Sequence, residues 1–176
     1  MIDAPPVLEG KGPGASGLAD FESFYRANRV RLFRALVVMT RDVHSAEELT
    51  QESFVKVWER WERVVTMADP IGYLYRTALN GWFQVHRRAG RAARRVGLSR
   101  HVLDPIETVD ERDMLARQLL QLPARQRAAL VLTDYLGHSS TTAGRALGIR
   151  PGTVRRLASK ARATLRQRLE EEEGTQ

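Results

Sequence analysis

Apolar side chains recur at helical spacing through most of this chain. Between residues 20 and 90 they return every three or four positions, which predicts three amphipathic helices. The apolar stripes of these helices are, in chain order, Phe21, Phe24, Tyr25, Leu32, Leu36 and Met39; Phe54, Val57, Trp58, Trp61 and Val65; and Ile71, Leu74, Tyr75, Ala78, Leu79 and Trp82. Three such helices can bury one core, so we expect residues 18–90 to form a first domain.

Each of the three helices has a candidate start signal. Asp20 can cap the first helix, and Ser45 with Glu48 three residues later forms a capping box for the second. The third opens at Asp69–Pro70, a capping residue followed by proline at the first helical position. These signals separate the periodic stretches into distinct helices.

The second half of the chain repeats this organisation on a smaller scale. Thr108 with Glu111 is another capping box, and the helix after it carries Leu115, Leu119 and Leu122 on one stripe. Pro123 then restarts the chain into a helix over 124–136, which Gly137 ends. With the two helices described next, we expect a four-helix second domain over residues 109–169.

The end of this second domain reads as a helix-turn-helix. Residues 141–147 and 153–165 have helical patterns, and the turn between them contains Gly148, Pro151 and Gly152. From Arg145 to Arg168 there are eight basic residues and no acidic one. A plain helical hairpin remains the alternative, but a solvated face usually mixes charge signs, so the pattern favours DNA binding.

Three segments lie outside the two predicted domains. Residues 1–17 are rich in proline and glycine and predict a disordered leader. Residues 91–108 predict a basic flexible linker, and residues 170–176 a solvated acidic tail. The fold class we expect is all-α: two small helical domains joined by a basic flexible linker, the second containing the helix-turn-helix.

Charge and composition narrow the function. The formal net charge of +7 favours a polyanionic partner, and an anionic membrane surface is the competing explanation. No apolar run is long enough to cross a membrane, so no membrane insertion is expected. The chain has no cysteine and no paired histidine spacing, and it carries no nucleophile elbow or phosphate-binding loop. We therefore expect no metal, no cofactor and no catalytic activity, and a cytoplasmic location.

Two further clusters are open on residue chemistry alone. One cluster is Glu48, Gln51 and Glu52, which lie near one face of the second helix. Its acidic groups either interact favourably with the helix dipole and face water, or provide a docking face for a basic protein surface. Tyr73, Arg76, Asn80, Phe83 and Arg87 follow near-helical spacing opposite the apolar stripe of the third helix. In one interpretation the aromatic rings complete the core and the arginines face water. In the other these side chains hold unstacked bases by ring stacking and phosphate contacts.

In this order, the segments resemble a family. The chain is similar to a bacterial RNA polymerase sigma factor of the extracytoplasmic-function group. The similarity lies in the acidic segment 47–54, the two tryptophans Trp58 and Trp61, the segment 69–80, the segment 122–127 and the final helix-turn-helix, taken together. The resemblance covers about residues 20–169. Each motif is weak alone, and the ordered set is specific.

The resemblance implies partners and roles. The partners would be core RNA polymerase and promoter DNA, with an anti-sigma factor as a further candidate. The polymerase contacts would be the clamp helices of the largest subunit and the flap of the second-largest subunit. Glu48, Gln51 and Glu52 match the clamp-docking segment. The loop 64–69 and the helix carrying Tyr73, Arg76, Asn80 and Arg87 match the part that melts and reads the minus-ten element. Arg155, Arg156, Ser159 and Lys160 match positions that read the minus-thirty-five duplex, and Arg150, Thr153 and Arg162 are expected to meet phosphates.

The chain departs from the family pattern within the helix-turn-helix. Ala143 and Gly144 replace larger residues, so we expect the first helix of the motif to be less well packed. Leu157 and Ala158 also depart from the pattern, which affects the minus-thirty-five preference. Two rivals remain: a stand-alone helix-turn-helix repressor or activator that binds a symmetric operator, and an arginine-rich RNA-binding protein.

Overall fold

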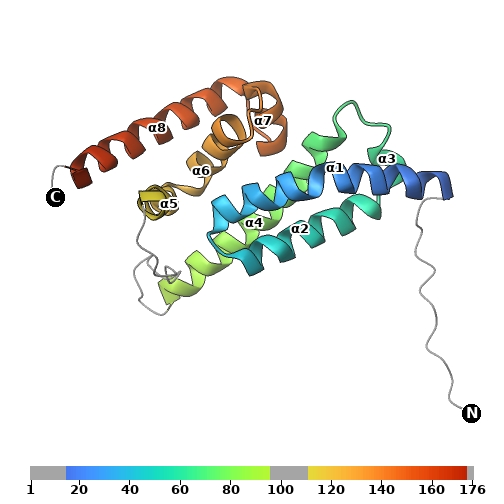
Figure 1. The fold of residues 1–176 in the computed structure, drawn as a ribbon, viewed down its shortest axis with the longest axis horizontal. Helices are drawn as coiled ribbons and strands as arrows, with labels where there is room; N and C mark the ends of the chain where they lie inside the picture. Colours follow the sequence, from blue (N-terminus) through green and yellow to red (C-terminus); the bar gives the residue numbers. More distant parts are fainter. Residues whose placement is uncertain (1–14, 96–110, 174–176) are drawn as a thin grey trace, which may run out of the picture.

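The computed structural model describes residues 15–95 and 111–173, and within these ranges the chain is helical with no strand (Figure 1). The first module contains α1 (Ala15–Thr40), α2 (Val43–Trp58), the single turn α3 (Trp61–Val64) and α4 (Pro70–Arg95). The second contains α5 (Glu111–Gln121), α6 (Ala124–Leu130), the π-helical turn η1 (Val131–Tyr135), α7 (Ser140–Leu147) and α8 (Pro151–Glu173). The all-α fold with two helical modules is confirmed.

The core of the first module lies between α1, α2 and α4. Leu32, Leu36 and Met39 of α1 and Leu74 of α4 are fully buried, as their helical spacing predicts. Two predicted stripe members are wrong, because Val65 and Ile71 are exposed. The second predicted helix also ends earlier than its stripe, at Trp58, and the chain turns before Trp61 starts α3.

Asp42, rather than Ser45, caps α2. The Asp42 carboxylate accepts hydrogen bonds from the backbone N–H groups of His44 and Ser45, both at 3.1 Å. The Ser45 hydroxyl also donates to this carboxylate. These hydrogen bonds, that from the Ser45 side chain first, lower the pKa of Asp42. The capping box was therefore a wrong prediction: the true cap lies three residues upstream and uses Ser45 as a donor.

The other helix starts also differ in part from expectation. α1 begins at Ala15, so Asp20 lies inside the helix, and residues 15–17 of the predicted leader are helical. Asp69 does cap α4, accepting from the Gly72 N–H at 2.8 Å. α4 continues to Arg95, which makes the first part of the predicted 91–108 linker helical. The rest of that linker, the Thr108 cap and residues 1–14 lie outside the described residues.

In the second module α6 packs on α8, and α7 and α8 form the predicted helix-turn-helix. The predicted helix over 124–136 divides into α6 and the π-helical η1, and Gly137 then adopts a positive φ of 68°. α8 extends to Glu173, well beyond the predicted end at residue 165. The predicted acidic tail is therefore helical over residues 170–173. Leu115, a predicted stripe member, is 44% exposed.

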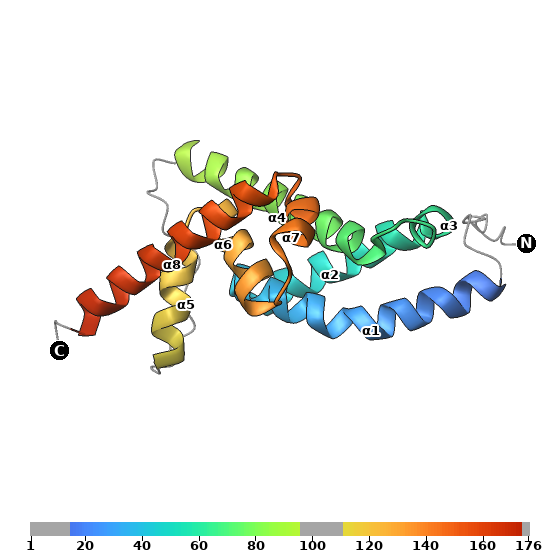
Figure 2. The ribbon, with the colours of Figure 1, turned by 90° about the horizontal axis from the view of Figure 1, so that it is seen from above.

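The two modules pack against each other. α7 lies beside α4, and α1 contacts η1 and α5 (Figure 2). Buried residues of both modules, such as Leu79 and Trp82 of α4 and Ala128 and Leu132 of the second module, belong to one hydrophobic cluster. The sequence pattern did not predict this packing between the modules.

Candidate nucleic-acid interface

The acidic residues of α2 lie on its outer face. Glu48, Gln51 and Glu52 are exposed, whereas Leu49 and Phe54 on the opposite face are buried. Glu48 approaches His44 at 3.2 Å and Glu52 approaches Lys56 at 3.3 Å, both pairs one helical turn apart and open to solvent. Exposed pairs of this kind are weak, so both carboxylates can exchange these partners for basic groups on another protein.

The aromatic and basic residues of α4 share one face. Arg76, Asn80 and Arg87 are exposed and Tyr73 is half-buried. Arg60 follows α2 in the chain. Its guanidinium donates to the Tyr73 hydroxyl at 3.2 Å and holds the ring at the start of α4. Sequence reasoning missed Arg60, because it is brought to Tyr73 only by the turn between α2 and α3.

The basic residues of the helix-turn-helix lie on the solvent side of α8. Val154, Ala158, Ala161 and Leu165 are buried against the module, which fixes the opposite side outward. On that outward side the exposed residues are Arg155, Arg156, Ser159, Lys160 and Arg162, with Arg150 exposed before the helix and Thr153 half-buried. A helix that buries small apolar residues and presents basic ones fits the docking geometry of a recognition helix.

Two of these arginines already have partners within the second module. Arg155 donates to the Ser140 hydroxyl at 3.1 Å, and Arg162 lies 3.0 Å from both carboxylate oxygens of Asp134. Both contacts are exposed and join α8 to the helices before it. They orient the guanidinium groups along the surface of the motif.

The turn of the motif depends on Gly144. The Ile149 N–H donates to the Gly144 carbonyl at 3.0 Å, and a Cβ at position 144 would lie 2.7 Å from the Ile149 carbonyl oxygen. Ala143 and Val154 beside it are both fully buried. The small residues let the turn approach α7 closely, and the expectation that the first helix of the motif is less well packed stays a prediction. Gly148 ends α7 at a φ of 66°, as its place in the sequence predicts.

A groove separates the start of α4 from the helix-turn-helix. Tyr73 and Arg76 line one wall, and Arg145 and Arg150 belong to the opposite wall. Arg145 lies 3.3 Å from the Asp69 carboxylate across the groove. The structure thus brings Arg150 together with Tyr73 and Arg76, whereas Asn80 and Arg87 do not line this groove.

Arg127 is a buried guanidinium at the boundary of the two modules. It donates to the Met39 carbonyl at 2.6 Å and to the carbonyls of Leu120 and Leu122, and its guanidinium carbon lies 5.6 Å from the centre of the Trp82 ring. Burial lowers the pKa of Arg127 to about 10, so it stays charged at neutral pH. The sequence offered no sign of this role among the many arginines.

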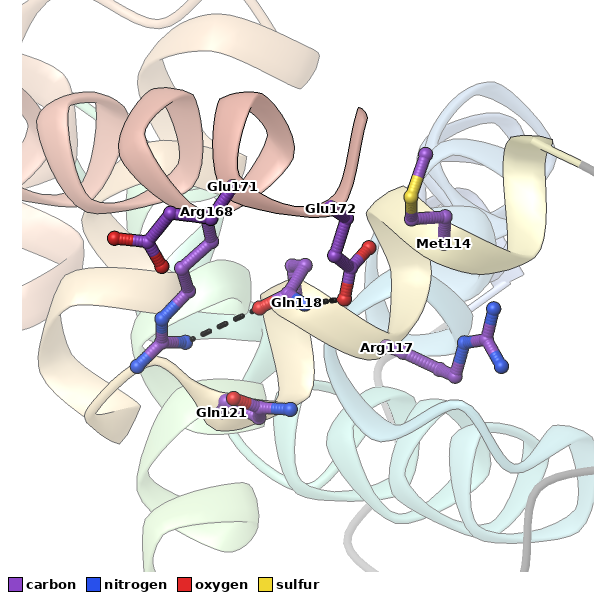
Figure 3. A pocket seen from close by; sticks show the side chains of 7 residues that line it. All are labelled: Met114, Arg117, Gln118, Gln121, Arg168, Glu171 and Glu172. Carbon is purple, nitrogen blue, oxygen red and sulfur yellow. Dashed lines mark hydrogen bonds between the residues drawn. The ribbon is translucent and has the colours of Figure 1, made fainter. Parts of the chain in front are cut away.

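A second pocket lies between α5 and the end of α8 (Figure 3). There the buried Gln118 amide donates to Glu172 and accepts from Arg168 at 3.5 Å. These bonds attach the last turns of α8 to α5 (Figure 3). Glu172 thus contributes to the fold of the second module.

The described ranges hold neither a metal-binding group of side chains nor a membrane-spanning helix. No three histidine or acidic side chains in the described ranges lie close enough to bind a metal ion. The described helices are too short or too polar to cross a bilayer.

Comparison with protein families matches both modules. Residues 24–92 match Sigma-70 region 2, and residues 112–165 match Sigma-70 region 4. Among curated proteins, the chain is 29% identical over 172 residues to the ECF RNA polymerase sigma factor SigE of Mycolicibacterium smegmatis, covering 91% of this chain and 65% of that protein. It is 27% identical over 167 residues to the ECF RNA polymerase sigma factor SigL of Mycobacterium tuberculosis, covering 91% of this chain and 94% of the relative.

Two solved structures have the same fold. The sigma factor RpoE in complex with the anti-sigma factor NepR from Bartonella quintana matches with a TM-score of 0.71 at 21% identity, over 86% of this chain and 97% of that one. CnrH in complex with the cytosolic domain of CnrY matches with a TM-score of 0.65 at 23% identity, over 88% and 90%. With regions 2 and 4 in this order on one chain, which is helical over its described ranges, and with ECF sigma factors as its relatives, the protein belongs to the extracytoplasmic-function group of the sigma-70 family.

Proposed function

We propose that this protein binds core RNA polymerase and directs it to promoters, acting as an initiation factor without catalytic activity of its own. The observation that carries the proposal is the match to regions 2 and 4 in one chain whose corresponding faces are exposed. The protein would act in the cytoplasm together with the polymerase. An anti-sigma factor is a further candidate partner from the family resemblance.

The first domain, proposed as residues 18–90, would provide polymerase docking and minus-ten recognition. Glu48, Gln51 and Glu52 are proposed to contact the clamp helices of the largest subunit, supported by their exposure on α2. Tyr73, Arg76, Asn80 and Arg87 are proposed to hold unpaired minus-ten bases, since an aromatic ring with arginines suits single-stranded DNA.

The second domain, proposed as residues 109–169, would read the minus-thirty-five element as duplex and contact the flap of the second-largest subunit. Arg155, Arg156, Ser159 and Lys160 are proposed as base-reading positions, and Arg150, Thr153 and Arg162 as phosphate contacts. Exposure of the basic side of α8 supports this assignment. The linker would carry the chain between the two domains on the polymerase.

The docking assignment is tested by reversing two charges. Glu48→Arg with Glu52→Arg places like charge on the face that would meet a basic surface, and a like-charge contact costs binding strongly. We expect the double variant to lose co-purification with core polymerase while its helical circular-dichroism signal is unchanged.

A matched control changes the net charge by the same amount elsewhere. Glu22→Arg with Glu62→Arg reverses two exposed carboxylates on α1 and α3. This control should still bind core polymerase and support run-off transcription. Retention of core enzyme by the Glu48/Glu52 variant would refute the docking face. Tight binding of the isolated protein to a palindromic site, without polymerase, would support the stand-alone regulator instead.

A further inference from the structure

Arg60 lies at the junction between α2 and α3, where hydrogen bonds hold its backbone on both sides. Its N–H donates to the Val57 carbonyl at 3.1 Å, and its own carbonyl accepts from the N–H groups of Arg63 and Val64 at 3.0 and 2.9 Å. The next residue, Trp61, is buried against aromatic rings of α1. The Arg60 side chain therefore leaves the backbone from a fixed point.

The Tyr73 side chain is held at both of its ends. The Tyr73 backbone N–H, in the first turn of α4, donates to the Asp69 carbonyl at 3.1 Å. The hydroxyl at the far end of the ring accepts from the Arg60 guanidinium at 3.2 Å. The two residues meet because α3 and the loop after it join α2 to α4 (Figure 1). The ring packs in part on the hydrophobic cluster and also lines the groove at the start of α4, so a part of it stays accessible.

The bond between Arg60 and Tyr73 is not explained by helix capping. Arg60 is the residue before α3, yet its side chain makes no capping hydrogen bond there and reaches across to Tyr73 instead. The guanidinium is exposed, and one exposed hydrogen bond contributes little to the stability of a fold. Its effect on the position of the ring is therefore the more informative property.

A ring that is already in place is a better platform for a base. A tyrosine side chain rotates about two bonds, and ordering a side chain at the moment of binding lowers the affinity. The bond from Arg60 restricts this rotation before DNA arrives. Stacking itself accepts any base, so a fixed ring selects by position, favouring the one nucleotide that reaches it.

We propose that Arg60 is a positioning residue for Tyr73: its hydrogen bond to the hydroxyl fixes the ring for stacking on one unpaired base of the minus-ten element. This inference rests on the proposed function, which assigns Tyr73 to the minus-ten bases and gives Arg60 no part. Because Arg60 acts through the ring, loss of its side chain and loss of the Tyr73 hydroxyl should have the same effect.

A premelted promoter separates base capture from melting. The template is a fragment on which the wild-type protein and core polymerase produce a run-off transcript, with a mismatch bubble placed over the minus-ten element. An abasic site replaces each bubble nucleotide in turn, on either strand, and the affinity of the holoenzyme is measured. We expect wild-type holoenzyme to lose about tenfold at the nucleotide that stacks on Tyr73, and Tyr73→Ala to be insensitive there.

The variants of Arg60 are measured on the same templates. Arg60→Ala and Tyr73→Phe should each reduce the loss at that nucleotide to about threefold or less, and the double variant should resemble either single one, because both changes remove the same bond. Arg63→Ala is the matched control, since Arg63 is also exposed, lies on α3 and carries the same charge. It should keep the wild-type profile.

The outcomes separate this inference from the proposed function. If Arg60→Ala weakens binding to every template by the same factor, Arg60 is a phosphate contact and its positioning role is overturned. A wild-type profile in Tyr73→Phe would overturn that role as well. An unchanged profile in Tyr73→Ala would remove the minus-ten assignment of Tyr73 and the inference with it. Absence of any transcript from the wild-type protein with core polymerase would overturn the proposed function itself.

Fluorine NMR measures the ring directly in the free protein. The chain has four tyrosines, so labelling with 3-fluorotyrosine gives few resonances, and Tyr73→Phe identifies that of Tyr73. Arg60→Ala should move this resonance, whereas Arg63→Ala should leave it in place. An unmoved resonance in Arg60→Ala would show that Arg60 does not hold the ring in solution, and would refute the inference whatever the affinities are.

Discussion

Asp69 uses the two oxygens of its carboxylate for different purposes. One oxygen accepts from the Gly72 N–H and caps α4, and the other faces Arg145 at 3.3 Å. The cap starts the helix that carries Tyr73 and Arg76, whereas the ion pair crosses the boundary between the modules. A single side chain therefore contributes both to local structure and to the packing between the modules.

Two substitutions separate these contributions. Asp69→Ala removes the cap and should lower the free energy of unfolding by about 1 kcal/mol in urea titrations. Asp69→Asn keeps an oxygen for the Gly72 N–H and loses the charge, so its loss in unfolding free energy should be clearly smaller. Equal losses in both variants would mean that the carboxylate acts through its charge and not as a cap.

At this scale the sequence predicted some roles and missed others. Asp69–Pro70 was identified as a helix start, because a capping side chain followed by proline is a local signal. Arg127 was not singled out, because nothing local distinguishes an arginine that becomes buried between two modules. Asp42 was overlooked because a capping box at Ser45 fitted the same helix equally well.

The helix-turn-helix depends on the absence of a Cβ atom at Gly144. Gly144 lies inside α7 and faces the carbonyl of Ile149, a residue of the turn before α8. Alanine is normally the better helix former by up to about 1 kcal/mol. At this position the backbone oxygen cannot move aside without shifting the whole turn.

We therefore expect Gly144→Ala to lower the free energy of unfolding by about 1–3 kcal/mol, as overpacking does in other cores. Gly152→Ala is the matched control, because a Cβ there meets only the Arg155 side chain at 3.8 Å. The control should be neutral or slightly stabilising. Chemical denaturation of both variants measures the difference, and an equally stable Gly144→Ala protein would contradict this account of the turn.

Periodicity predicted the existence of most helices but not their ends. α1 starts earlier and α8 ends later than predicted, since bonds such as Gln118 to Glu172 extend α8 beyond its apolar stripe. The apolar stripe predicts ordinary α-helix over η1, because such a stripe does not distinguish a π-helical turn from an α-helix. The exposure of basic residues on α8 followed directly from the burial of Val154 and Ala158.

At the scale of the whole molecule, His138 links the packing between the two modules to pH. Its ring lies between the modules, faced by Tyr75 of α4, Arg31 of α1 and Asp69 before α4. Burial first and then Arg31 lower its pKa below the usual 6.5, against an opposing effect of Asp69. The neutral ring is thus favoured where the modules pack together, and the His138 contribution to this packing is fully present above pH 6.5 and is lost as pH drops through the lowered pKa.

Acidification should therefore favour opening. With a donor and an acceptor dye on Glu59→Cys and Gln167→Cys, two exposed positions in different modules, we expect the fluorescence transfer efficiency to fall between pH 7 and pH 5 in the otherwise wild-type protein. His138→Gln, which does not titrate, should flatten this response. A response of equal size in the His138→Gln protein would show that groups elsewhere govern the pH dependence.

The basic side of α8 is exposed to solvent beside the groove at the start of α4. The phosphate contacts proposed for this side would be independent of sequence and would weaken steeply with salt. A molecule not engaged with polymerase would then spend its time loosely held along bulk chromosomal DNA, sliding or hopping between sites. The fraction of the protein that diffuses freely would be small. The ionic strength in the cell would set how many free copies can bind a core polymerase that carries no initiation factor.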